Sequence, residues 1–139
     1  MPIPGFTPQG QLPPGDHKAT IKEVEERFTW TFGRRALYDG LVYVADNLTQ
    51  RNVDIIWVDG SFVTNKERPR DVDVAYEVPD GTAPEHWGLF SPIRRHDLKK
   101  YMRVDLLPYW PGQDDIKQIF CHDRNGSEKG IIQLIWEAA

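Results

Sequence analysis

The chain has 139 residues, of which 40% are hydrophobic and 27% charged, with a net charge of −4 at pH 7. This size and balance are typical of a single folded domain and exclude disordered and fibrous classes. The negative charge argues against a protein that holds nucleic acid by bulk electrostatics, which needs clustered Lys and Arg. No apolar run reaches the roughly 20 residues of a membrane helix. A single cysteine and a start without signal-peptide features favour the cytoplasm.

The N-terminal part of the chain divides into an arm and two helices. Residues 1–16 are rich in Pro and Gly, so we expect an extended arm that lies over a single domain formed by residues 17–139. The Thr20-Ile-Lys-Glu23 segment has the form of a capping box and predicts that a short helix starts there. Apolar residues between 36 and 48 then recur every three or four positions, which predicts a helix of about five turns.

The remainder of the chain has the pattern of a sheet. Residues 53–59, 71–78 and 102–107 are rich in apolar or alternating residues and predict strands, with a helix-compatible segment at 92–101 before the third. Residues 130–136 form a fourth candidate strand, although their apolar run is equally compatible with a helix. We therefore predict an α+β fold: a mixed sheet of about four or five strands with helices packed on one face.

Two acids on the second predicted strand are the first sign of chemistry. Asp71 and Asp73 are two residues apart, so their side chains project from the same face of the strand, with Cα atoms roughly 6.5 Å apart. Two carboxylates this close are stable when one takes a proton or when they share a cation such as Mg²⁺ or Mn²⁺. A pair that only faces solvent needs no metal, and both interpretations are open from the strand alone.

The Gly60-Ser61 pair upstream favours a bound phosphate. Glycine at the end of a buried strand lets the backbone approach a ligand, and Ser61 can cap a short helix over 62–67 before Pro69 ends it. Lys66, in the following loop, could neutralise phosphate charge or simply face solvent. We expect phosphate and metal to meet between this loop and the Asp71–Asp73 strand, on the face of the sheet without helices.

A third acid interrupts the next apolar run. Asp105 lies within Val104-Asp-Leu-Leu107, where burial makes a charge costly without a partner. A position at a strand edge facing water is the alternative. Asp54 and Asp59 fit that edge role better, because they flank their apolar run instead of interrupting it.

Together these residues resemble a known family. Gly60-Ser61, nine further residues, Asp71-Val-Asp73 and a later Asp105 look like the nucleotidyltransferase superfamily typified by DNA polymerase beta. Within it the chain is most similar to small prokaryotic and phage nucleotidyltransferase-like proteins of unknown function. Asp59 before the Gly-Ser pair and Lys129-Gly-Ile-Ile132 near the end contribute to the similarity.

The resemblance implies an enzyme with a metal-dependent mechanism. Asp71, Asp73 and Asp105 would be the catalytic carboxylates and the ligands of Mg²⁺ or Mn²⁺, with Asp105 also a base for the acceptor hydroxyl. Gly60, Ser61 and Lys66 would bind the triphosphate of ATP or another nucleoside triphosphate. The monophosphate would pass to an RNA end or a protein hydroxyl, in a toxin–antitoxin or phage-defence setting that would bring a helical toxin-type partner protein.

A second interpretation stays open from the sequence. The spacer between Ser61 and Asp71 is shorter by one residue than in typical minimal members, and the chain is too short to include the helical domain of larger relatives. A nucleotide-binding or partner-binding module that resembles an antitoxin and has little or no activity is therefore the alternative.

Overall fold

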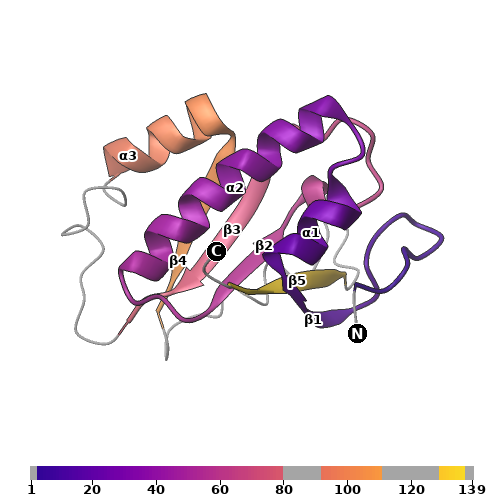
Figure 1. The fold of residues 1–139 in the computed structure, drawn as a ribbon, viewed down its shortest axis with the longest axis horizontal. Coiled ribbons are helices and arrows are strands. Elements are labelled where there is room, and N and C mark those ends of the chain that lie inside the picture. Colours follow the sequence, from indigo (N-terminus) through magenta and orange to yellow (C-terminus); the bar gives the residue numbers. More distant parts are fainter. Residues whose placement is uncertain (1–2, 80–91, 111–128, 137–139) are drawn as a thin grey trace.

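The computed structural model describes residues 3–79, 92–110 and 129–136. Within them a five-stranded mixed sheet has the order β1-β5-β2-β3-β4 (Figure 1). The strands are β1 (Gly15–Thr20), β2 (Ile56–Asp59), β3 (Val72–Glu77), β4 (Val104–Tyr109) and β5 (Gly130–Ile135). The helices are α1 (Ile21–Phe28), α2 (Phe32–Gln50) and α3 (Pro92–Asp97), with a 3₁₀ turn, η1 (Ser61–Val63), and a π-helical turn, η4 (Leu98–Met102). The predicted α+β class is confirmed.

The sheet differs from the prediction at its two edges. Strand β1 was not predicted, because Gly15-Asp-His-Lys-Ala-Thr20 has little strand propensity and becomes a strand by pairing in parallel with β5. That pairing, with the antiparallel pairing of β5 to β2, also makes residues 130–135 a strand and not a helix. At the other edge β4 continues through Pro108 to Tyr109, which an edge strand tolerates because one side of its backbone needs no partner.

Threonine side chains cap the first two helices, and the first of these caps was predicted. The Thr20 N–H donates to the Glu23 carboxylate at 2.8 Å and the Glu23 N–H donates to the Thr20 hydroxyl at 3.1 Å, completing the capping box of α1. Thr31 caps α2 by accepting from the Arg34 N–H at 3.1 Å. Helix α2 has 19 residues, yet no helix in the described part of the chain has the length and apolar character needed to cross a membrane.

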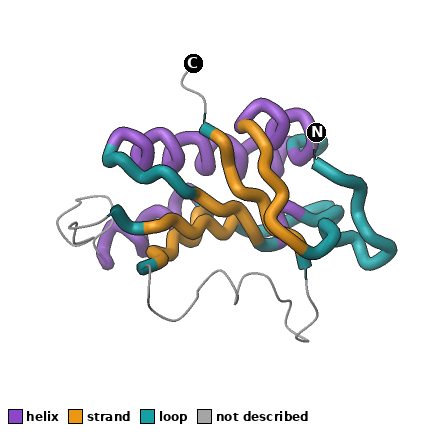
Figure 2. The backbone as a smooth tube through the Cα atoms, turned by 90° about the horizontal axis from the view of Figure 1, so that it is seen from below, coloured by secondary structure: helices purple, strands orange, loops and turns teal. Residues whose placement is uncertain are grey.

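The two faces of the sheet have different partners. Helices α1 and α2 lie along one face (Figures 1 and 2), and their apolar side chains join Val58, Val74, Leu106 and Ile132 in the main core. Side chains from alternate positions point to the other face, where Trp57, Ala75 and Ile131 form a smaller buried cluster. The even–odd alternation of the strands therefore decides which acids face away from the helices.

The arm is fastened to the domain along its described length. Ile3 and Leu12 are buried, and the Arg27 guanidinium donates to the carbonyl oxygens of Ile3 and Pro4. The Asn65 N–H donates to the Gly10 carbonyl at 2.9 Å. The arm thus lies beside the loop that follows Gly60.

Candidate functional site

Three aspartates from three strands form a row on the face of the sheet without helices. Asp59 of β2 is paired in register with Asp73 of β3, and Asp73 is paired with Asp105 of β4. Residues paired directly opposite each other point to the same face, and neighbouring strands are about 4.8 Å apart. Asp71 lies just before β3, two residues from Asp73, and its negative charge acts on Asp73. The register thus aligns two of the three predicted carboxylates, Asp73 and Asp105, and adds Asp59. Asp59, Asp73, Asp105 and the neighbouring Asp71 are called the carboxylate row below.

Asp59 is the most buried member of this carboxylate row. Its side chain is 2% exposed, and one of its oxygens lies 3.1 Å from the Lys129 ammonium group. Neither oxygen accepts a hydrogen bond of standard geometry within the described residues. Burial raises the pKa of Asp59, while the charge of Lys129 and the nearby Gly60 N–H lower it. Asp59 was predicted to be a plain edge residue, and this was wrong because its strand is the central one of the sheet.

Asp73, in the middle of the row, has the most perturbed acidity. Burial, and after it the negative charges of Asp71, Asp105 and Asp59, raise its pKa to about 7, against a smaller opposing effect of Lys129. Asp105 is partly exposed and lies 3.8 Å from the Lys99 ammonium group. The row therefore carries more negative charge than its own cations balance, which is an arrangement that a divalent cation would relieve.

Gly60 gives the row open space at the end of β2. Its backbone has φ of 86° and ψ of −171°, a combination that is essentially restricted to glycine. A Cβ atom built there would lie 2.8 Å from an Asp73 carboxylate oxygen. Glycine is required both by the backbone and by the closeness of Asp73, so the loop that starts at Gly60 approaches the carboxylates without a side chain between them.

The loop after Gly60 differs from the predicted short helix. The turn covers only Ser61–Val63, begins at Gly60 and has no side-chain cap, so Ser61 is its first residue and not its cap. The reason lies in Arg34, which is fully buried and competes for the carbonyl groups that a longer helix would use. Its guanidinium donates to the backbone carbonyl oxygens of Phe28, Ser61, Phe62, Thr64 and Lys66.

Arg34 fixes the orientation of this loop. Because Arg34 is buried, the carbonyl oxygens it binds point into the protein, and those oxygens are the groups that would repel a phosphate on the outside. Its guanidinium also stacks 3.7 Å from the centre of the Trp30 ring. Burial lowers the pKa of Arg34 to about 10, partly offset by Glu67, so Arg34 keeps its charge at neutral pH. The Lys66 side chain is exposed beyond this anchored loop.

Comparison with known families gives one match. The model of a family of unknown function, DUF6932, covers residues 4–135. The chain belongs to the DUF6932 family. No match was found among curated proteins or among solved structures. The family match covers the arm, the carboxylate row and the Gly60 loop alike.

Three residues of this site were not identified as site residues from the sequence. Asp59 gave a partial signal, since it directly precedes Gly-Ser, and so did Lys129, which precedes the apolar run of β5. Arg34 gave none, because an arginine near the start of a helix is ordinary. Within the described residues, no three Asp, Glu, His or Cys side chains converge tightly enough to hold one metal ion as they stand. Binding an ion would require rotation of the carboxylates within the row.

Proposed function

We propose that this protein is a metal-dependent nucleotidyltransferase, which moves a nucleoside monophosphate from a nucleoside triphosphate to an RNA end or a protein hydroxyl. The observation that carries the proposal is the carboxylate row in register across β2, β3 and β4, directly beside Gly60. Acids from adjacent strands next to a glycine-started loop are what a metal–triphosphate ligand requires.

The donor set fits a hard divalent cation. All of its atoms are carboxylate oxygens, the ligands that Mg²⁺ and Mn²⁺ prefer. Asp71, Asp73 and Asp105 would hold the metal. The cation would relieve both the burial and the like-charge repulsion that raise the pKa of Asp73, and this relief would contribute to the binding free energy. When bound, the ions would stabilise the attacking and leaving oxygens at the α-phosphate.

The other residues of the site have separate roles in this proposal. Gly60 lets the backbone approach the triphosphate, and Ser61 and Lys66 contribute donors at the phosphates. Asp105, which is partly exposed, would accept the proton of the acceptor hydroxyl. Lys129 holds Asp59 in place and offsets one charge of the carboxylate row.

A second candidate is a nucleotide-binding or partner-binding module without turnover, for example the antitoxin of a toxin–antitoxin pair with a helical toxin. Two observations favour it: Lys129 already acts as an internal counter-ion of Asp59, and the described carboxylates do not converge as they stand. In that case nucleotide binding would persist and pyrophosphate would not be released.

The test measures melting temperature and pyrophosphate release with each of the four nucleoside triphosphates and Mg²⁺ or Mn²⁺. If the protein is a nucleotidyltransferase, the triphosphate and metal should raise its melting temperature, and EDTA should abolish this rise. Pyrophosphate should also be released when RNA or protein acceptors are present. The Asp71→Asn/Asp73→Asn variant should lose both, while Asp54→Asn, an exposed acid before β2, should keep both. A shift without pyrophosphate release supports the module, and no shift with any triphosphate refutes the enzyme and a nucleotide-binding module.

A further inference from the structure

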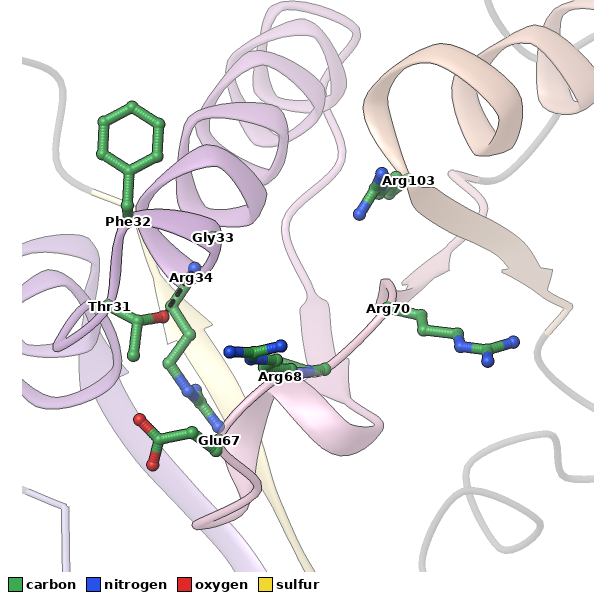
Figure 3. A pocket seen from close by; sticks show the side chains of 9 residues that line it. Thr31, Phe32, Gly33, Arg34, Glu67, Arg68, Arg70 and Arg103 are labelled. Carbon is green, nitrogen blue, oxygen red and sulfur yellow. Dashed lines mark hydrogen bonds between the residues drawn. The ribbon is translucent and has the colours of Figure 1, made fainter.

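Two adjoining pockets beside the start of α2 form a groove outside the carboxylate row. One, with a volume of about 590 Å³, is lined by residues 31–34, 67–70 and 103, and the other, of about 420 Å³, lies along α2 next to η4. Gly33 and Arg103 line both pockets, so the two lie side by side. Figure 3 shows the first pocket, with the start of α2 on one side and Arg68, Arg70 and Arg103 around the other.

The groove is basic in a chain whose net charge is −4. Arg68, Arg70 and Arg103 line it, and none of the three forms an ion pair within 4 Å with another described residue. Glu67 and Asp39 are the acids among the lining residues. The buried Arg34 is committed to backbone carbonyls and is not counted here. Guanidinium groups without an ion-pair partner among the described residues, in an open groove, are suited to bidentate binding of phosphate.

Two exposed aromatic side chains border the same groove. Phe32, in the first pocket, is 93% exposed, and Tyr101, in the second, is 72% exposed. Figure 3 shows that Phe32 projects from the start of α2 away from the arginines. Lys100 lies over the Tyr101 ring, 5.2 Å from its centre. Exposed rings that flank a basic groove offer surfaces on which unpaired bases can stack, in the way that single-strand-binding proteins use them.

Two of the groove arginines lie in the segments that lead into the strands of the carboxylate row. Arg70 directly precedes Asp71, and Arg103 is two residues before Asp105. The Val72 N–H donates to the Arg103 carbonyl at 2.9 Å, which joins the two arginine-bearing segments where β3 and β4 begin. A nucleic-acid strand bound in the groove would therefore have its end close to the acids of the carboxylate row.

We propose that this groove binds single-stranded nucleic acid, with phosphates on Arg68, Arg70 and Arg103 and bases against Phe32 and Tyr101. The inference deepens the proposed function, and rests on it only where it names this strand as the acceptor. Binding of the strand itself needs neither metal nor triphosphate, because none of these five side chains belongs to the carboxylate row.

The test is the fluorescence anisotropy of labelled 12-nucleotide RNA and DNA strands with the full chain, in EDTA and without triphosphate. Each phosphate contact with a single strand contributes about −0.7 to the slope of log K, the association constant, against log salt concentration. Three contacts therefore predict a slope of about −2. Arg68→Gln, Arg70→Gln and Arg103→Gln should each weaken binding and make the slope shallower by about 0.7. Phe32→Ala should weaken binding about tenfold with an unchanged slope, as expected for one lost base stack.

The matched control is Lys22→Gln, which removes an exposed charge from α1, away from both pockets, and should leave binding and slope unchanged. Binding of RNA, DNA or both supports the groove and identifies its ligand. Absence of binding, or equal losses in the control and the arginine variants, overturns the inference. It is also overturned if the arginine variants lose only the triphosphate-induced shift in melting temperature, because the groove is then the triphosphate site. If the protein binds the RNA or DNA strand but its melting temperature does not change with triphosphate, the nucleotidyltransferase proposal is refuted and the groove proposal is still supported.

Discussion

Replacement of Asp73 by Asn tests the electrostatics of the carboxylate row directly. The folded protein holds the Asp73 proton up to a pKa of about 7, whereas an ordinary Asp loses it at 3.8. Between these pH values the folded state binds more protons than the unfolded state, so raising the pH destabilises the fold. At about 1.36 kcal/mol for each pH unit, the loss is about 4 kcal/mol, complete above about pH 7. Solvent screens the charges of the partly exposed neighbouring acids, which reduces this loss of stability to about 2–4 kcal/mol.

Asp73→Asn removes the titrating group and keeps its shape. We expect the variant to match the wild-type protein near pH 4 and to exceed its free energy of unfolding by about 2–4 kcal/mol at pH 8. Urea unfolding from pH 4 to pH 8 measures the difference, with Asp54→Asn as an exposed control. Parallel pH curves for the Asp73→Asn variant and the wild-type protein would refute the reasoning. Millimolar Mg²⁺ at pH 8 should narrow the gap, because only the wild-type row would gain from the cation.

Three further substitutions test the surroundings of the row by urea unfolding. Gly60→Ala should lower the free energy of unfolding by about 2–3 kcal/mol, because its backbone conformation is restricted to glycine and a carboxylate lies close by. Gly5→Ala, whose Cβ would meet no atom within 4 Å, should cost little, and equal effects of the two substitutions would contradict this account. Arg34→Met should cost about 3 kcal/mol or more by leaving buried carbonyls unpaired, against less than about 1 kcal/mol for Arg35→Met, whose ion pair is half-exposed. Lys129→Met should cost about 3 kcal/mol at pH 8 and less as the pH falls, because burial raises the pKa of Asp59 and a protonated Asp59 needs no counter-ion; a cost independent of pH would exclude the ion pair as its cause.

Local sequence determined the elements whose signals lie within a few residues. The capping box at Thr20 set the start of α1, because both of its hydrogen bonds join residues three positions apart. The apolar periodicity of α2 and the alternation of β3 likewise follow from which side chains must be buried. The glycine at position 60 was identified from its place after an apolar strand.

Tertiary structure decided what depends on partners distant in the chain. Gly15–Thr20 is a strand only because β5 pairs with it, and the Asp59–Asp73–Asp105 alignment depends on the register of three strands, which no local pattern specifies. The burial of Asp59 and its pairing with Lys129 follow from the central position of β2. The loop after Gly60 is a further example, because the predicted helix is only one turn long in the structure. Long-range hydrogen bonds from the Arg34 guanidinium to the loop carbonyls outweigh the local helix propensity there.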